Sequence, residues 1–492
     1  TVPLDPGTYV RVAEALKRYA PRSSAVAVAP GLAATPDTPN ARRQAIHAMY
    51  GDAFGLNLAG GLAVLGTLVA GLVVAPWAGL SALAAFCLQP LVALFRVPVR
   101  PADRRRVPPL RWALWPVRLV RTIVGPWPSS ESRDLVEELR PVYAELLAAD
   151  EARFWEPRRP DCPFCGSERI RLRVRCSDLL RHKPGVFVLD RCDDCGLVFQ
   201  NPRLSPAGLD YYYRDFYDGL GEGQAAAIWD IGDSTYLKRA ETVRAVTSPE
   251  RWLDVGTGHG HFCLLASTVL PDTRFDGLDM GESVEEAERR QWITTGHRGT
   301  FPELAPSLAG QYDVVSMHHY LEHTLDPLAE LDSAAQVLAD GGHLLIELPD
   351  PESTWGRWLG RYWLPWFQPQ HLHLMSIGIL ERALVERGFT IVDRDRAGAS
   401  QGADLTAAVW MLIGRFAPPA NLPWLPRPTG RDRARRAVGM AVGALPLAAA
   451  IGIDFLLARL PSRPGQSNAY RVLARAPSAR SEPSETSETS AA

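Results

Sequence analysis

Residues 251–260, RWLDVGTGHG, predict a short apolar strand that ends in a turn of alternating glycines. A helix is expected to follow over 261–270. Glycines at such a turn let a ligand approach the backbone closely, although the spacing alone indicates only a nucleotide-like ligand. The next strand, 274–279, ends in Asp279, 23 residues after Gly256, where the second strand of a doubly wound sheet carries a carboxylate for ribose hydroxyls.

Strands and helices continue to alternate after this first unit. Hydrophobic periodicity predicts strands over 312–317, 343–348 and 389–393, and helices over 326–339 and 376–387. Strands that alternate with helices form a parallel sheet with helices on its faces. The sequence therefore predicts an α/β fold.

The spacing of the glycines separates two classes of cofactor. A dinucleotide dehydrogenase needs G-x-G-x-x-G to place a pyrophosphate, whereas this turn has G-x-G-x-G after Asp254. S-adenosylmethionine contains no phosphate. The spacing therefore disfavours a pyrophosphate site, while a methyltransferase stays possible.

Several further segments resemble class I S-adenosylmethionine-dependent methyltransferases. The resemblance rests on Asp254 to Gly260 and Asp279, together with LEHTLDP at 321–327, VLADGGHLLIE at 337–347, HLHLMS at 371–376 and LERALVERGF at 380–389. It covers about residues 160–476 and implies a Rossmann-like, seven-stranded methyltransferase sheet. It also implies which residues hold the methionine part of the cofactor: Asp254 and the backbone of Gly256, Gly258 and Gly260. Asp279 is expected to bind the ribose hydroxyls.

Two histidines are candidates for a general base. A sulfonium methyl needs little activation, but a sugar hydroxyl acceptor must lose its proton, and histidine is the usual base. His323 follows the fourth strand at the cleft end of the sheet and His371 lies in a later loop, so we expect both to be catalytic. The alternative is that Glu322 and His323 brace the helix that begins near Asp326.

Four cysteines form two C-x-x-C pairs, each followed by glycine. Cys162 and Cys165 are separated from Cys192 and Cys195 by 26 residues, a spacing that presents four thiolates tetrahedrally and suits structural Zn2+. A redox disulfide is the alternative, but redox C-x-x-C motifs usually occur singly. With the Asn-Pro-Arg and tyrosines after it, this zinc ribbon over 158–220 resembles the module before the catalytic domain in bacterial methyltransferases associated with sugars and cell-surface polysaccharides.

Tyrosines gather behind the cysteines, at 211–213 and at 217. Each offers an apolar ring and a polar tip, so the group suits either a junction between two domains or the lining of a substrate cleft. We favour the junction.

Residues 57–95 contain no Asp, Glu, Lys, Arg or His. One bilayer crossing needs about 20 apolar residues, so this run predicts a transmembrane helical hairpin with two crossings. Arginines flank the run on both sides, which places both ends in the cytoplasm by the positive-inside rule. The alternative is a buried helix pair. We therefore expect a protein on the cytoplasmic face of a bacterial inner membrane.

A second apolar segment lies near the C-terminus, as an insertion over 437–460 before a last predicted strand over 469–474. Pro446 is expected to interrupt it and Asp454 to end it. The segment is too short for two crossings, so it should lie on the membrane or dip into it, unless it is a buried helix packed on the sheet. The tail over 477–492, rich in Ser, Glu and Thr, is predicted to be disordered.

The remaining boundaries follow from composition. Residues 1–56 loosely resemble the late catalytic region of family 2 glycosyltransferases, but the acidic motifs are missing, so the segment is interpreted as a remnant without activity. A basic juxtamembrane and linker region spans 96–150, and the methyltransferase domain is expected over 230–476. With 53 basic against 55 acidic residues the formal charge is −2, which excludes a broadly basic nucleic-acid-binding surface.

These features together predict a membrane-anchored S-adenosylmethionine-dependent methyltransferase. We expect it to methylate a sugar or lipid-linked glycan in cell-envelope polysaccharide biosynthesis, with a glycosyltransferase as partner. Two alternatives stay open. One is a methyltransferase of another small molecule, such as a quinone, lipid or secondary metabolite. The other is a non-catalytic, cofactor-binding scaffold for a glycosyltransferase.

Overall fold

The computed structural model describes residues 130–148, 151–214, 233–399, 402–419, 421–460 and 463–478. The chain divides into two units, Thr1–Trp127 and Pro128–Ala492, and all described residues belong to the second. The predicted remnant 1–56, the predicted transmembrane hairpin 57–95, most of the basic region 96–150 and nearly all of the tail therefore lie outside the described residues.

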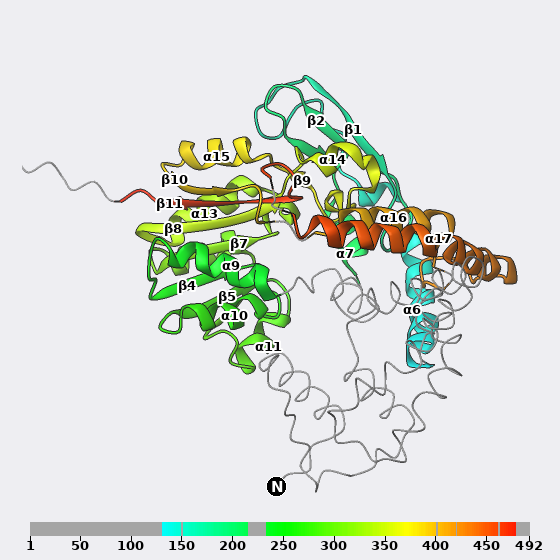
Figure 1. Cartoon of the computed structure of the whole chain (residues 1–492), viewed down its shortest axis with the longest axis horizontal. Helices are drawn as coiled ribbons and strands as arrows, with labels where there is room; N and C mark the ends of the chain where they lie inside the picture. The colour runs from blue at the N-terminus through cyan, green and yellow to red at the C-terminus, as the bar shows by residue number, and fades with distance from the viewer. Residues whose placement is uncertain are drawn as a thin grey trace, which may run out of the picture. The chain divides into compact units, whose positions relative to one another are not determined.

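A seven-stranded sheet forms the centre of the described unit, as predicted (Figure 1). Its order is β10-β11-β8-β7-β4-β5-β6. The neighbours from β8 to β6 pair in parallel, whereas β11 is antiparallel to both β8 and β10. The strands are β4 (Arg251–Val255), β5 (Arg274–Asp279), β6 (Gly296–Arg298), β7 (Tyr312–His318), β8 (Leu338–Pro349), β10 (Thr390–Asp395) and β11 (Ala469–Arg475).

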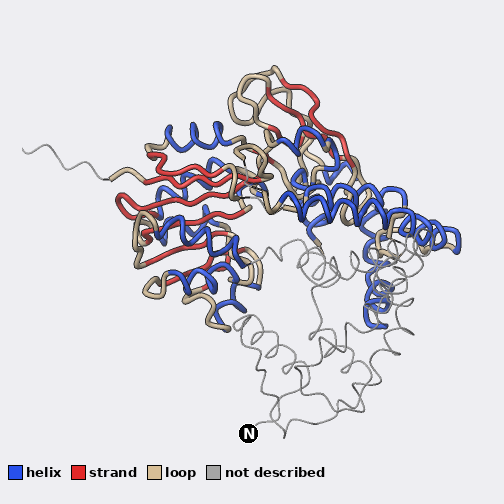
Figure 2. Tube along the Cα trace, in the orientation of Figure 1, coloured by secondary structure: helices blue, strands red, loops and turns tan. Residues whose placement is uncertain are grey.

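Helices cover both faces of this sheet (Figure 2). One apolar core lies between the sheet and α12 (Phe301–Leu304), η2 (Ala305–Leu308), α13 (Pro327–Val337) and α15 (Ile377–Glu386). A second core lies between the sheet and α9 (Asp233–Arg244), α10 (His261–Val269) and α11 (Ser283–Arg289). A sheet buried on both faces explains why its strands are nearly continuous apolar runs.

The strand boundaries follow the sequence closely where local chemistry fixes them. β4 and β5 begin and end where the apolar pattern predicts. α13 is shorter than its predicted range because Asp326 is its N-cap, with Oδ1 accepting from the N–H groups of Leu328 and Ala329, and because β8 already begins at Leu338. Asp326 thus caps this helix itself, while η3 (Leu321–His323), which contains Glu322 and His323, packs against α13.

The cysteine-rich region forms a second, antiparallel sheet in the order β1-β2-β3-β9. Its strands are β1 (Ile170–Cys176), β2 (Phe187–Cys192), β3 (Val198–Gln200) and β9 (His373–Leu374). β9 belongs to the loop before α15, a helix that covers the seven-stranded sheet. The cysteine-rich region is therefore hydrogen-bonded directly to the part of the chain that contains this sheet.

A third apolar cluster joins this region to α6 (Ser130–Ala148), η1 (Glu151–Phe154) and α7 (Pro206–Tyr213). Tyr211 and Tyr212 are buried in it beside Tyr143, Phe187 and Trp424. These two tyrosines therefore lie at a junction, as predicted.

A long helical hairpin lies between β10 and β11 in the sequence. It is formed by α16 (Asp404–Phe416) and α17 (Gly430–Leu457) (Figure 1). The prediction that Pro446 interrupts this segment is wrong. Pro446 lies on the exposed side of α17, while the opposite side packs along α16, so the helix continues through it. Among the described helices, α17 is the one whose length and composition would suffice to cross a membrane.

Candidate active site

The glycine turn after β4 can be built only from glycine at its critical positions. Gly256, Gly258 and Gly260 have φ angles of +76°, +52° and +74°, in the left-handed region. A Cβ on Gly256 would lie 2.7 Å from the Tyr320 ring, and one on Gly260 would lie 2.9 Å from Ala287. A Cβ on Gly258 would meet nothing within 4 Å. The turn therefore keeps its backbone accessible at Gly258.

Asp279, at the end of β5, lies beside this turn. Its Oδ2 accepts a hydrogen bond from the backbone N–H of Gly258 at 2.9 Å, and Oδ1 accepts one from Gly281 at 2.8 Å. The structure thus brings Asp279 and the glycines together, as the sequence predicts. Their contacts with a cofactor stay a prediction.

Asp254 is buried inside the sheet next to the turn. Its Oδ1 accepts a hydrogen bond from the Ser316 hydroxyl at 2.6 Å, and that hydroxyl accepts one from the Trp252 indole at 2.8 Å. Burial raises the pKa of Asp254 to about 6, although the hydrogen bond from Ser316 works in the opposite direction. Asp254 therefore braces β4 against β7 at the root of the glycine turn.

The turn that follows β7 carries the acidic and basic groups of the site. His319 has φ +52° and lies between two carboxylates: its Nδ1 is 3.2 Å from Glu322 Oε1 and its Nε2 is 3.4 Å from Glu347 Oε1. Despite desolvation, these two carboxylates raise the pKa of His319 to about 9. His319 is therefore an imidazolium at neutral pH, and the pKa of Glu322 is lowered even though the side chain is buried.

The two predicted catalytic histidines lie against each other. The ring centroids of His323, in η3 (Leu321–His323), and His371 are 4.6 Å apart and the rings are nearly perpendicular. Desolvation lowers the pKa of both imidazoles, that of His371 to about 3. Both rings are thus neutral at pH 7. The fold brings them into contact although they are 48 residues apart in the sequence.

Hydrogen bonds distinguish the two imidazoles. His371 Nδ1 lies 2.8 Å from the Pro365 carbonyl, which can only accept, so Nδ1 carries the proton and Nε2 faces Glu322 at 4.0 Å. His323 Nδ1 lies 2.9 Å from the hydroxyl of Tyr213, and that hydroxyl donates to the Gln370 carbonyl at 3.2 Å. His323 is partly exposed, whereas His371 is buried. His323 is accordingly the better placed base.

The same groups offer metal ligands. One carboxylate oxygen of Glu322 and one nitrogen each of His323 and His371 lie within 4.8 Å of one another. A carboxylate and two imidazoles are a common donor set for divalent transition metals.

Tyr320 connects this cluster to the glycine turn. Its ring packs on Gly256, and its hydroxyl donates to Glu330 Oε2 at 3.0 Å. Because β4 and β7 are parallel neighbours, their following turns meet at one edge of the sheet. The predicted cofactor residues and the predicted bases are thus adjacent.

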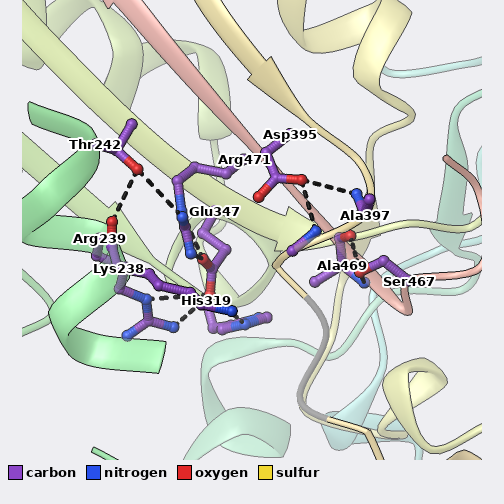
Figure 3. Close-up of polar contacts among 11 residues, drawn as sticks. Lys238, Arg239, Thr242, His319, Glu347, Asp395, Ala397, Ser467, Ala469 and Arg471 are labelled. Atoms are coloured by element: carbon purple, nitrogen blue, oxygen red, sulfur yellow. Dashed lines mark hydrogen bonds and ion pairs between the residues drawn. The ribbon is translucent and has the colours of Figure 1, made fainter. Parts of the chain in front are cut away.

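A buried ionic network adjoins the cluster at His319 (Figure 3). Glu347, on β8, is fully buried and pairs with Arg239 of α9 and Arg471 of β11. Arg239 Nε is 3.1 Å from Glu347 Oε1, and Arg471 Nε is 2.9 Å from Oε2. The same carboxylate contacts His319. Sequence reasoning missed this network, although a lone acid at the end of an apolar strand is a recognisable sign of it.

The four predicted cysteines converge at one end of the smaller sheet. The Sγ atoms of Cys162 and Cys195 are 3.6 Å apart, as are those of Cys165 and Cys192, and all four lie within 4.8 Å of one another. Zn–S bonds of about 2.3 Å in a tetrahedron require sulfur separations close to these. The donor set therefore fits Zn2+, with N–H groups of Cys195 and Leu197 directed at the sulfurs.

Residues 234–394 match a family model described as a methyltransferase domain. The chain therefore carries a class I methyltransferase domain. The match runs from α9 into β10 and includes the glycine turn, Asp279, His323 and His371. The four cysteines of the two C-x-x-C pairs, α16, α17 and β11 lie outside it. The predicted family is confirmed at the level of this domain.

Curated relatives agree over a shorter region. The chain is 34% identical over 110 residues to the ubiquinone biosynthesis O-methyltransferase of Marinobacter nauticus, which is 21% of this chain and 45% of the relative. It is 37% identical over 99 residues to the enzyme of that name from Vibrio parahaemolyticus, 19% of this chain and 41% of the relative. The chain thus spans less than half the length of these relatives.

A solved structure from Thermotoga maritima, described as a methyltransferase and possible histamine N-methyltransferase, is 15% identical, with a TM-score of 0.33. The alignment covers 54% of this chain and 99% of that one.

Proposed function

We propose that this protein is an S-adenosylmethionine-dependent methyltransferase that methylates a hydroxyl oxygen. The observation that carries the proposal is the adjacency of a neutral, partly exposed imidazole, His323, to a glycine turn built for close ligand approach. A hydroxyl is a poor nucleophile unless its proton is removed as the new bond forms, and this is the chemistry that a neutral imidazole supplies.

The residues at the glycine turn fit the cofactor. Asp279 would accept hydrogen bonds from the ribose hydroxyls, and the open backbone at Gly258 leaves room for the methionine part. When bound, S-adenosylmethionine supplies an electrophilic methyl group on a sulfonium, so the protein needs no further electrophile. What remains for the chain is to orient the acceptor, exclude water and take up one proton.

The chain's hydrogen bonds prepare His323 for that proton. Tyr213 donates to the Gln370 carbonyl, so its oxygen accepts from the Nδ1–H of His323. With the proton on Nδ1, Nε2 of His323 is the nitrogen that would take the proton of the acceptor hydroxyl. Once protonated, His323 is stabilised by the neighbouring Glu322 carboxylate. His371 fills the space beside it as a neutral ring.

The acceptor class that we propose first is a lipid-soluble small molecule with a phenolic or similar hydroxyl. The support is that two curated relatives, each matched over about a fifth of this chain, are named ubiquinone biosynthesis O-methyltransferases. A sugar or lipid-linked glycan is the second candidate, and the resemblance of the cysteine-rich region to modules of polysaccharide-associated methyltransferases supports it. A non-catalytic scaffold for a glycosyltransferase is the contrary outcome.

We extend the proposal to structural Zn2+ at Cys162, Cys165, Cys192 and Cys195, and to attachment of the chain to the cytoplasmic face of a bacterial inner membrane. The convergence of four sulfurs supports the first, and the uncharged run 57–95 supports the second. Elemental analysis tests the zinc: about one zinc per chain is expected, and a Cys165→Ser chain should lose it.

Acceptor profiling tests the activity. The detergent-solubilised full chain is incubated with S-adenosylmethionine labelled in the methyl group and with two panels, polyprenylated phenols and lipid-linked sugars. Label in the first panel supports the first acceptor class, and label in the second supports the glycan. Cofactor binding without transfer to either panel favours the scaffold.

A further inference from the structure

The hairpin of α16 and α17 has an exposed apolar surface. Twenty large apolar side chains are exposed among the described residues, and eleven of them belong to this hairpin or the turn after it. They are Trp410, Leu412, Phe416, Val438, Val442, Leu445, Ile453, Phe455, Leu456, Leu457 and Leu460. We call this set the outer face. Such a concentration marks an interaction site rather than ordinary surface.

The other side of α17 is already occupied. Met440, Gly443, Ala444, Leu447 and Ala450 are buried on it, and a Cβ added to Gly443 would lie 2.5 Å from Ile413 of α16. Val442 and Leu445, by contrast, are each 72% exposed. Residues 437–453 contain no charged side chain. A helix that is apolar all round is covered on all sides in its working environment, so the outer face needs a partner.

Contacts at both ends of α17 limit how that partner can be arranged. Near its C-terminus, Asp454 accepts hydrogen bonds from the N–H groups of Leu405 and Thr406 at the start of α16. Near its N-terminus, Arg435 and Arg436 donate to the carbonyls of Phe416 and Ala417. A helix of 28 residues is about 42 Å long, and both of its ends are bound to α16. The loop between the two helices is held on the cysteine-rich region by Trp424, whose indole N–H donates to the Arg181 carbonyl at 2.9 Å. α17 therefore lies along a surface and does not cross one.

The charges beside the outer face indicate a lipid surface. α17 begins with the sequence GRDRARR, and Arg431 and Arg433 are exposed there. Arg415, also exposed, precedes Phe416 at the end of α16. Arginines bind phosphate groups, and arginines beside exposed apolar side chains that include Trp and Phe are typical of helices that lie in the headgroup region.

We propose that the outer face docks on a bilayer that contains anionic phospholipid, with α17 lying parallel to it. The uncharged run 57–95 of the same chain is predicted to enter a membrane, which favours lipid over a second protein as the occupant. This docking does not depend on the identity of the acceptor.

Docking would place the bilayer close to the candidate active site. α16 contacts η4 (Gly360–Tyr362) and η5 (Leu364–Trp366). η5 includes Pro365, whose carbonyl holds the His371 ring. An acceptor dissolved in the bilayer would then approach the site from the side of this loop.

Photo-crosslinking of the full chain tests the docking. p-Benzoylphenylalanine replaces Val442 or Leu445, one position at a time, and each chain is reconstituted into nanodiscs of phosphatidylcholine and phosphatidylglycerol. The control is the same replacement at Leu172, which is 60% exposed on β1 and apart from the hairpin. Phospholipid adducts are expected at positions 442 and 445 and only background at 172.

Two further results decide the outcome. The adduct yield should fall when phosphatidylglycerol is omitted, or when Arg431→Gln and Arg433→Gln are combined with the probe. Adducts to residues 57–95 or to a second copy of the chain, in place of lipid, would overturn the proposal, and so would the absence of lipid adducts in chains with an unchanged unfolding midpoint.

Discussion

The glycine turn and the imidazole cluster lie at the same edge of the sheet but are built in different ways. The turn consists of consecutive residues, and its conformation follows from left-handed φ angles at Gly256, Gly258 and Gly260. The cluster is assembled from the turn after β7, the loop that carries His371, and Tyr213 of α7. The turn is therefore set by local sequence, whereas the cluster depends on tertiary packing.

The same contrast holds for the electrostatics within the cluster. His319 and His371 both lie near Glu322, yet the pKa of His319 is raised to about 9 and that of His371 is lowered to about 3. His319 contacts two carboxylates, whereas His371 is desolvated beside another imidazole. Sequence position alone cannot distinguish these environments.

The largest effect is expected from removal of the proposed base. His323→Asn should lower kcat by about 100- to 10,000-fold, because the acceptor hydroxyl then has no imidazole to take its proton. The affinity for S-adenosylmethionine should stay unchanged, since the glycine turn does not depend on this ring. The matched control is His297→Asn, at an imidazole on β6 whose Nε2 contacts Tyr312. Full activity of His323→Asn would remove His323 from the mechanism.

The next largest effect is expected on the free energy of unfolding, from removal of the Glu347 carboxylate in the buried ionic network. Glu347→Gln leaves the guanidinium groups of Arg239 and Arg471 buried without their carboxylate, which should cost about 3–5 kcal/mol of the free energy of unfolding. Urea denaturation measures this loss. The exposed Glu352, changed to Gln, serves as the control and should cost little. Equal stability of the two variants would show that the network is dispensable.

The pH dependence of the free energy of unfolding should show the titration of His319. Its pKa in the folded protein, about 9, lies above the ordinary value of 6.5, so its stabilising contribution is complete below pH 6.5 and is lost as pH rises to 9. The decline should approach about 3 kcal/mol. His371 acts in the opposite sense, because its lowered pKa makes stability fall as pH drops below 6.5. In unfolding titrations, His319→Gln should lack most of the alkaline decline; an unchanged decline would refute this assignment.

A smaller effect is expected where Tyr320 connects the glycine turn to the imidazole cluster. Gly258→Ala costs about 1 kcal/mol, because its φ angle is left-handed but the space beside it is open. Gly256→Ala adds a collision with the Tyr320 ring and should cost about 1–3 kcal/mol more. It should also lower kcat, since Tyr320 and His323 belong to one turn. Equal effects of the two substitutions on stability and kcat would show that the regions are independent.

Much of the sheet was predictable from sequence because buried parallel strands are apolar runs bounded by glycine and polar residues. The glycine turn and Asp279 were predictable for the same local reason. The sequence predicts His323 and His371 as candidate bases, but it does not predict that their rings are in contact, because that contact depends on the loop around Pro365. A lone acid at the end of an apolar strand marks Glu347 as a residue that needs a partner, but no local pattern identifies its two arginines, and none predicts the pairing of Tyr213 with His323, because these contacts join distant segments. The continuity of α17 through Pro446 was missed because packing on α16 compensates for the lost backbone hydrogen bond.

Titration calorimetry with S-adenosylmethionine measures the cofactor binding that the glycine turn and Asp279 are expected to provide. The detergent-solubilised full chain should bind one equivalent, and Asp279→Ala should lose most of the affinity, because Asp279 is the carboxylate beside the accessible backbone of the glycine turn. Asp272→Ala, at an exposed acid before β5, should bind like the unaltered chain. No binding by the folded, unaltered chain, or equal binding by the Asp279→Ala chain, would contradict the account.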